Sequence, residues 1–367
     1  MEYVQERITT LHDLGETGAG FPVRPAVLEE TAVVVPMTAR EHASPAAEAT
    51  LAELEVVDPG AVFVPVRASA ERIGPFREWL ESFDLSLRVL WCTGPGVSSV
   101  LAEAGLANGF GKGRDVWLAL GPAAADFEHV VVHDADARSY EAGHVSRLLA
   151  PLTMGFDFSK GYYARVEDGR LYGRLCRLLY EPLLEALADA HGEPVVDYLG
   201  AFRYALAGEF ALTADLARRL RPPRAWGLEV ATLGDAFEHA GFAGTAQVDL
   251  GRHEHDHRAV DGETGLEGMS REVAAALFRV LESRGVEPDY DGLRRRYRAT
   301  GDRFVDRFAA DAAFNGLAYD AAGEREQIGR YAGAISPPGE DTRLPAWLEA
   351  PFDPEAVVAA ATPWLEA

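Results

Sequence analysis

The chain has 367 residues, of which 48% are hydrophobic, so it can bury one large core or two closely packed domains. Its 35 basic and 58 acidic residues give a net charge of −23, which argues against nucleic acid or an anionic membrane as a partner. No apolar run approaches the roughly 20 residues that cross a bilayer, and the two cysteines form neither a disulfide framework nor a metal motif.

The basic residues are almost all arginine, and Lys112 and Lys160 are the only lysines. A chain this acidic and this poor in lysine is typical of a cytoplasm that accumulates salt, where ions screen the self-repulsion of the fold. Codon use in a GC-rich genome gives the same composition, and both causes can act together. The N-terminal residues show no basic start followed by an apolar block, so we expect a cytoplasmic protein without a secretory signal.

Short apolar runs alternate with helical patterns over the first 135 residues, after an N-terminal arm (1–30) with a short helical pattern. Strands are expected at 32–35, 61–64, 87–91 and 130–132, and helices at 40–56, 74–82, 97–105 and up to 120. This alternation is the signature of βαβ units, and it predicts an α/β fold with a parallel sheet.

Two carboxylates follow the fourth of these strands. Val130 to Val132 form a β-branched run typical of a strand buried on both faces, and Asp134 and Asp136 stand where it ends. Ligands bind at the carboxyl ends of strands in open α/β sheets, and alternate residues of an extended chain face the same way. The pair is therefore a candidate site for Mg²⁺ or Mn²⁺, with an ordinary acidic turn as the alternative.

A glycine-rich loop, residues 108–114, lies between the third and fourth strands and leads into a helix. It is not a P-loop, because its spacing differs and no Ser or Thr follows its lysine. Glycines at a helix start leave backbone N–H groups free, and a helix N-terminus favours anions. Lys112 adds a positive charge suited to phosphate. We therefore predict a phosphate-binding loop, with an ordinary flexible loop as the alternative.

After residue 136 the strict alternation stops. We expect helices at 140–150, 173–190 and 226–239, a hairpin of 156–165 and 169–172, a strand at 245–250, a helical region at 269–333 and a surface tail after it. Arg174 and Arg177 stand near the start of the second of these helices, where positive charge opposes the helix dipole. Either a bound anion or a salt bridge would relieve that cost.

Three histidines, His253, His255 and His257, alternate at the end of the last expected strand. In an extended segment their side chains would face one side, as metal ligands often do. We favour one of them completing the carboxylate site over a three-histidine zinc site, and a charged solvated loop is the alternative.

These segments resemble the retaining GT-A-type glycosyltransferases that make glucosyl-3-phosphoglycerate or mannosyl-3-phosphoglycerate, over roughly residues 30–275. The motifs that carry the resemblance keep their order and spacing: Gly111-Lys112-Gly113, Asp134-Ala135-Asp136, Lys160 before an aromatic pair, Gly173-Arg174 with Pro182-Leu183-Leu184, Gly208-Glu209-Phe210, Gly227-Leu228-Glu229, and Leu250-Gly251 followed by His255. The resemblance implies a Rossmann-like nucleotide-sugar-binding sheet of the GT-A type with a helical acceptor and C-terminal region.

The same resemblance divides the chain and assigns roles to single residues. The parts are the arm (1–30), a nucleotide-sugar-binding half (31–138), an acceptor-binding half (139–268) and a helical C-terminal region with a tail (269–367). The implied catalytic residues are Glu229, Asp136 and Lys112, and the implied metal ligands are Asp136, His255 and Asp134. The nucleotide is expected to contact Pro36, Glu41, Ser69, Gly111, Lys112, Asp134 and Ala135. The sugar and acceptor are expected to contact Lys160, Gly173, Arg174, Glu209 and Glu229.

Several positions depart from the family pattern. Cys176 and Arg177 stand where the family has Thr-Glu, and Glu181 replaces an arginine-like residue. These positions lie on the acceptor side, so glycosyl transfer is better supported than the acceptor itself. The turn from Pro36 to Glu41 is one residue longer than the family's Pro-x-x-Asn-Glu and lacks its Asn, which leaves the base of the donor open.

The resulting hypothesis is transfer of a hexose, glucose or mannose, from a nucleotide-diphosphate sugar to a small phosphorylated acceptor such as 3-phosphoglycerate. A bound Mg²⁺ or Mn²⁺ would neutralise the leaving diphosphate, and Glu229 would orient the sugar. The alternatives are an inverting transferase with a lipid-phosphate or polysaccharide acceptor, and a sugar-nucleotide-binding regulator without turnover. A nucleotidyltransferase fits less well, because its glycine-rich loop should follow the first strand. The helical C-terminal region could serve as a homodimer surface or as a lid.

Overall fold

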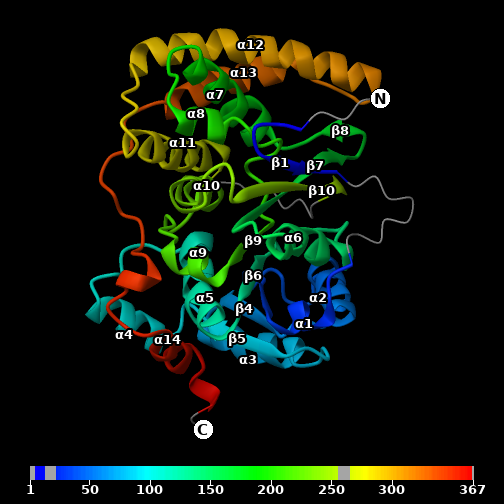
Figure 1. Cartoon of the computed structure of the whole chain (residues 1–367), viewed down its shortest axis with the longest axis vertical. Helices are drawn as coiled ribbons and strands as arrows, with labels where there is room; N and C mark the ends of the chain where they lie inside the picture. The colour runs from blue at the N-terminus through cyan, green and yellow to red at the C-terminus, as the bar shows by residue number, and fades with distance from the viewer. Residues whose placement is uncertain (1–4, 13–21, 255–264, 366–367) are drawn as a thin grey trace.

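A mixed sheet extends along the long axis of the molecule, with helices on both of its faces (Figure 1). The computed structural model describes residues 5–12, 22–254 and 265–365, and within them the sheet has ten strands. Their order is β1-β10-β7-β9-β6-β2-β4-β3, with β5 also on β4 and β8 on β7. The strands are β1 (Thr9–Leu11), β2 (Thr31–Val34), β3 (Met37–Thr38), β4 (Ala61–Arg67), β5 (Leu87–Trp91), β6 (His129–Val132), β7 (Phe158–Glu167), β8 (Arg170–Leu171), β9 (Phe210–Thr213) and β10 (Thr245–His253).

The helices gather in two groups along this sheet (Figure 1). Around the half that holds β2, β4, β5 and β6 lie α1 (Pro25–Glu29), α2 (Pro45–Val57), α3 (Ala70–Leu80), α4 (Pro95–Glu103), α5 (Lys112–Asp126), α9 (Ala214–Arg219) and α14 (Pro354–Ala361). Between the two groups, α6 (Gly143–Thr153) packs on β6, β7, β9 and β10. Around the other half lie α7 (Glu181–Ala188), α8 (Pro194–Leu199), α10 (Leu228–His239), α11 (Leu266–Glu282), α12 (Tyr290–Phe314) and α13 (Ala321–Tyr331). None of the helices in the described part of the chain has the length and apolar character needed to span a membrane.

The parallel sheet expected for the first 135 residues is confirmed, because β2 pairs in parallel with both β4 and β6, and β4 with β5. The hairpin is also confirmed, since β7 and β8 pair antiparallel around a turn at 168–169. The sequence analysis missed β9, which lies antiparallel between β6 and β7. Its apolar run of four residues is too short to distinguish from a buried loop or helix by periodicity.

Both ends of the chain differ from expectation. Residues 9–11, expected to belong to a helical arm, form an edge strand that pairs with β10. The expected surface tail contains α14 and a long connection before it, residues 335–353, which we call the strap. The helix expected at 173–190 is present but begins with a π-helical turn, Leu175–Tyr180.

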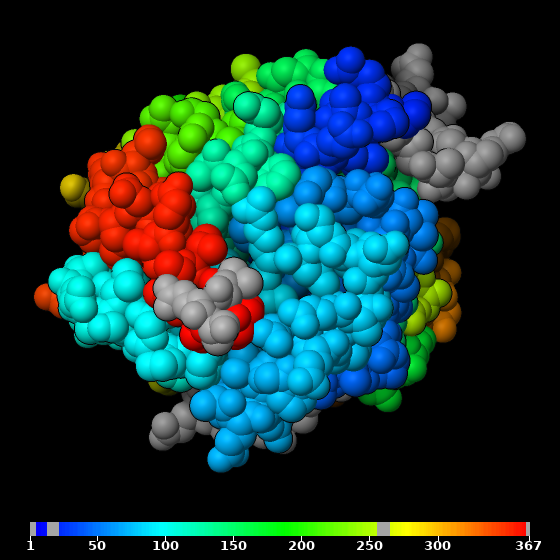
Figure 2. All heavy atoms as spheres, turned by 90° about the horizontal axis from the view of Figure 1, so that it is seen from below, coloured from blue at the N-terminus to red at the C-terminus, as the bar shows by residue number. Residues whose placement is uncertain are grey.

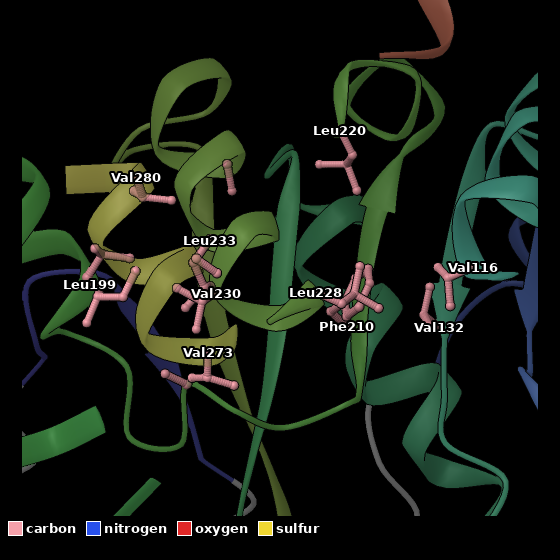
Figure 3. Close-up of a cluster of buried hydrophobic side chains, with 14 of the residues drawn as sticks. Val116, Val132, Leu199, Phe210, Leu220, Leu228, Val230, Leu233, Val273 and Val280 are labelled. Atoms are coloured by element: carbon pink, nitrogen blue, oxygen red, sulfur yellow. The ribbon is translucent and has the colours of Figure 1, made fainter. Parts of the chain in front are cut away.

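The sheet separates two clusters of buried side chains, and neighbouring strand residues point to opposite clusters. Val33 and Val131 belong to one cluster, whereas Val34, Val130 and Val132 belong to the other. Strands buried on both faces read as continuous apolar runs, which is why these segments were recognisable in the sequence. Figure 3 shows part of the larger cluster, with side chains from β6, β9, α5, α10 and α11.

Arg177 lies in the π-helical turn before α7 and connects that turn to α13. Its side chain is buried and not exposed to solvent. Its guanidinium donates two hydrogen bonds, of 2.7 and 3.0 Å, to the carboxylate of Glu324, and a third of 2.8 Å to the carbonyl of Tyr172. Both side chains of the ion pair are more than nine-tenths buried. Of the two explanations for a positive charge near this helix start, a salt bridge is the one found.

The strap follows α13 in the chain and connects the helical group of α11, α12 and α13 to α5. Trp347 stacks on Trp117 of α5 with ring centroids 4.5 Å apart, and each indole N–H donates to a carbonyl of the opposite segment. A Cβ at Gly121 would lie 2.3 Å from the Trp347 ring, so only glycine permits this approach. After the strap, α14 packs against α4, and Figure 2 shows the C-terminal residues (red) beside that part of the surface (cyan).

Replacing Trp347 by Ala should lower the free energy of unfolding by about 3–5 kcal/mol, because the change empties a buried indole site. Urea-induced unfolding followed by far-UV circular dichroism measures this loss. Leu348→Ala is the matched control: Leu348 is 58% exposed on the same turn, so its truncation should cost less than about 0.5 kcal/mol. A loss at Trp347 no larger than at Leu348 would contradict this description of the strap.

Glu181, at the start of α7, is a partly buried carboxyl that makes no salt bridge within the described residues, although the charge of Arg177 acts on it. The thiol of Cys176 approaches one of its oxygens at 3.7 Å. Burial raises the pKa of Glu181 to about 7 from 4.5. The folded state therefore binds more protons than the unfolded state between these two pH values, and the stability of the fold falls as pH rises through that window.

Glu181→Gln should remove this dependence, because the amide carries no charge at any pH. We expect the variant to be more stable than the parent at pH 8, by up to about 3 kcal/mol, and to lose the advantage near pH 4.5. Thermal unfolding at pH 5, 6, 7 and 8 measures the effect. Parallel curves for the two proteins would mean that Glu181 is not the titrating group.

Candidate functional site

The site is built where β9 meets the carboxyl end of β6. Because β9 is antiparallel to β6 and β7, its first residue, Phe210, pairs both with Val132 and with Lys160. This register brings Glu209 beside Lys160 and next to the chain that leaves β6. A Cβ at Gly208 would lie 2.2 Å from a carboxylate oxygen of Asp134, so glycine is required there for the two segments to meet.

Each functional side chain stands beside an apolar residue that is fixed in the core. Figure 3 shows four such anchors: Val116, Val132, Phe210 and Leu228. The candidate site residues one to four positions away are Lys112, Asp134, Glu209 and Glu229. Since the anchors belong to one buried cluster, their polar neighbours are held at one edge of the sheet.

Lys112 joins two carboxylates from distant parts of the chain. Its ammonium lies 2.6 Å from an oxygen of Asp134 and 2.9 Å from an oxygen of Glu229. Burial alone would lower the pKa of Lys112, but the charges and hydrogen bonds of the two carboxylates more than offset it, and the pKa is raised. Lys112 therefore stays cationic throughout the physiological range, between the residues expected to contact the nucleotide and the sugar.

The backbone of the glycine-rich loop differs from expectation. The amides of Gly113 and Arg114 donate to the carbonyls of Ala225 and Arg224, at 3.3 and 2.9 Å, and are not free to bind an anion. A Cβ at Gly113 would lie 1.9 Å from the carbonyl oxygen of Pro223, so this glycine serves contact with the protein. The prediction of free N–H groups was wrong for these two residues, and the expected phosphate role of the Lys112 side chain stays a prediction.

Asp136 lies in a strongly negative surrounding. Burial raises its pKa to about 7, and the neighbouring charges of Asp134, Glu209 and Glu41 add to the rise, while Lys112 opposes it. Burial likewise raises the pKa of Glu209 to about 7, and one of its oxygens makes no hydrogen bond within the described structure. Buried like charges of this kind are relieved by a cation, and carboxylate oxygens suit a hard divalent one.

Lys160 is buried near these carboxylates, and only 1% of its surface is exposed. Its ammonium donates to the carbonyl of Ala207 and lies 5.5 Å from the ring centroid of Phe210. Burial lowers its pKa to about 8, although Glu229 and Glu209 act in the opposite direction. Lys160 and Glu209 are thus both covered by other residues, and their expected contact with a sugar or acceptor stays a prediction.

A row of rings connects Glu209 to the expected acceptor motif. His253, fully buried, lies 3.9 Å from an oxygen of Glu209 and stacks on Tyr163 with centroids 4.1 Å apart. Tyr163 contacts Tyr204, and the Tyr204 hydroxyl would lie 2.3 Å from a Cβ at Gly173. Gly173 also has a φ of +75°, which favours glycine. Arg174, next to it, is exposed.

Ser69, one of the residues expected to contact the nucleotide, lines an open groove of about 640 Å³ together with Arg67. Ser69 precedes α3 and makes no capping hydrogen bond there. The turn after Pro36 reaches the same groove through Ala39, and Glu41 closes that turn by accepting from the amide and hydroxyl of Thr38 at 2.6 and 2.7 Å. Ala135 and Gly111 are buried between these parts.

The sequence analysis missed the ion pair that ties this groove to α5. Arg67 donates to the carboxylate of Asp115 at 2.8 Å, and Asp115 is 1% exposed. Asp115 stands three residues after Lys112, so the pair fixes the lysine relative to the groove. Its only sequence signal is the position of Arg67 at the end of a strand, where parallel sheets carry ligand-binding residues.

The third expected metal ligand, His255, lies outside the described residues, as does His257. Within residues 5–12, 22–254 and 265–365, no three His, Cys, Asp or Glu side chains are arranged to hold a metal ion. The donor chemistry of Asp134 and Asp136 nevertheless fits a hard cation, because their oxygens crowd together with too little positive charge nearby.

Comparison with known proteins identifies relatives along nearly the whole chain. No family model matches it. A glucosyl-3-phosphoglycerate synthase from Methanococcoides burtonii is 32% identical, over 95% of this chain and 94% of that protein. A second synthase of this name, from Persephonella marina, is 35% identical, over 73% of this chain and 70% of that protein.

Solved structures give the same result. The crystal structure of glucosyl-3-phosphoglycerate synthase from Mycobacterium tuberculosis with Mn²⁺, UDP and phosphoglyceric acid matches with a TM-score of 0.55 and 25% identity, over 77% of this chain and 88% of that one. The complex with Mg²⁺ and UDP matches with a TM-score of 0.55 and 26% identity. The chain therefore belongs to the glucosyl-3-phosphoglycerate synthases, which are GT-A glycosyltransferases.

Proposed function

We propose that this chain transfers glucose, with retention of anomeric configuration, from a nucleotide-diphosphate glucose to 3-phosphoglycerate, with Mg²⁺ or Mn²⁺ bound. The observation that carries the proposal is Lys112 held between Asp134 and Glu229. The family resemblance assigns Asp134 to the nucleotide and Glu229 to the sugar, so a lysine that contacts both would lie near the donor bond that breaks. The ligands printed for the solved relatives, Mn²⁺ or Mg²⁺ with UDP and phosphoglycerate, support the same substrates.

The residues of the candidate site would have distinct roles in this reaction. Asp134 and Asp136 would hold the cation, with His255 as the third ligand that the family resemblance implies. When bound, that cation supplies Lewis-acid neutralisation of the diphosphate. Lys112 adds a fixed positive charge next to the same leaving group. Glu229 accepts hydrogen bonds from sugar hydroxyls and keeps the ring in one orientation.

Glu209 and Lys160 would hold Asp134, Asp136 and Glu229 in position from the interior of the protein. Lys160 is anchored by the Ala207 carbonyl, and its charge partly offsets those of Glu209 and Asp134.

Retention needs no protein nucleophile if the acceptor attacks from the side on which the diphosphate departs. Glu229 then orients the sugar without forming a bond to it.

Asp136→Ala should lower glucosyl transfer by roughly 100-fold or more at saturating Mn²⁺, because the cation loses one of its carboxylates. It should also abolish the rise in melting temperature that Mn²⁺ with UDP-glucose gives the parent protein. Asp302→Ala is the matched control, since Asp302 is exposed on α12, and it should leave both measurements unchanged. Full turnover by Asp136→Ala would exclude Asp136 as a ligand.

A substrate panel tests the finer assignment. UDP-glucose, GDP-glucose, UDP-mannose and GDP-mannose are each offered with 3-phosphoglycerate or glycerol 3-phosphate, and the products are identified by mass spectrometry. We expect glucosyl-3-phosphoglycerate as the main product, with the α-anomer established by NMR coupling constants. A β-anomeric product would favour the inverting alternative, and tight donor binding without any product would favour a regulator.

A further inference from the structure

The loop between α9 and α10, residues 221–227, lies at the centre of the site although it carries none of the expected functional residues. Its Arg224 and Ala225 carbonyls accept hydrogen bonds from the first turn of α5, which begins at Lys112. It ends at Gly227, whose φ of +91° turns the chain into α10 two residues before Glu229. One loop thus sets the relative position of Lys112 and Glu229.

The strap holds this loop from the outside. The Arg224 guanidinium donates to the carbonyl of Thr342 at 3.1 Å and to that of Leu106 at 2.6 Å. The amide of Leu344 donates to the carbonyl of Pro222 at 3.0 Å. Leu344 is completely buried, so this contact belongs to the interior of the protein.

The strap is itself fixed at both ends. Arg279 of α11 donates to the carbonyls of Pro338 and Glu340 at 2.9 and 2.6 Å. At the other end, the Trp347–Trp117 stack fixes the strap to the middle of α5. The strap therefore contacts α5 directly and also through the loop, and Figure 1 shows its course (orange to red) from the helical layer to α5 and α14.

We infer that the strap positions Lys112 for the transfer step, and that Arg224 is the positioning residue through which it acts. This inference rests on the proposed function, because it presumes that Lys112 acts on the leaving group. Because α5 begins at Lys112, a shift of its first turn displaces the root of the side chain whose ammonium bonds Asp134 and Glu229. A displacement of about 1 Å in a charged group costs up to about 100-fold in rate.

The test is a double-mutant cycle on the full-length enzyme. The four proteins are the parent, Arg224→Gln, Lys112→Gln and the double variant, and kcat and both KM values are measured for each. Arg224→Gln should lower kcat by about tenfold and leave the KM for 3-phosphoglycerate within about twofold. In the Lys112→Gln background the same change should cost less than about twofold, because Arg224 acts through Lys112.

Arg219→Gln is the matched control. Arg219 lies five residues before Arg224 and pairs with Asp215 on the surface, where such a pair contributes little. Its kcat should equal that of the parent. If Arg224→Gln does not fold, Arg224→Lys replaces it in the cycle, since it keeps the positive charge and removes the fork that bonds both the Thr342 and the Leu106 carbonyls.

Two results would overturn the inference alone: an unchanged kcat in Arg224→Gln, or the same loss of kcat with and without Lys112. The second would mean that Arg224 acts through Glu229 or on general stability, and not through Lys112. Parental kcat in Lys112→Gln would overturn the role of Lys112 in the proposed function as well. A loss in Arg224→Gln that disappears in the double variant would support both.

Discussion

A single ammonium group shared by two carboxylates is the contact on which the site depends. Lys112 begins α5, Asp134 follows β6, and Glu229 begins α10, so three segments far apart in the sequence meet at one charge. The contact is possible because each residue stands next to an apolar anchor in the same buried cluster. Loss of the lysine would leave two partly buried carboxylates facing each other, which is costly in a medium less polar than water.

The scarcity of lysine in the chain is relevant to this site. Arginine supplies nearly all positive charge elsewhere, yet both lysines of the chain are in the site. An ammonium is a compact charge that three oxygens can surround, whereas a planar guanidinium requires room for its fork. Even so, Asp134, Asp136, Glu209 and Glu229 outnumber the two lysines, and the pKa values raised by burial and repulsion at Asp136 and Glu209 express that imbalance. A divalent cation would offset it, and that cation would also bind the negatively charged diphosphate.

The acceptor side and the C-terminal region are connected more closely than the division of the chain into parts suggests. Arg177, which departs from the family pattern, bonds Glu324 of α13 and the carbonyl of Tyr172. Glu181 is partly buried beside Cys176, whose thiol approaches its carboxyl. Both departures therefore have roles in packing. The C-terminal helices and the strap in this way support the acceptor motif from one side and α5 from the other.

The sequence by itself determined the strands of the first half and the identity of most candidate residues. Strands buried on both faces are continuous apolar runs, and Asp134, Lys112 and Glu229 stand in motifs whose order can be compared along a chain. The tertiary structure alone decided which of these residues touch. The antiparallel insertion of β9, the Arg67–Asp115 pair, the use of the α5 amides by the 221–227 loop and the course of the strap all depend on contacts between distant segments. Such contacts leave no periodic pattern in a sequence, because each partner alone is an ordinary arginine, glycine or tryptophan.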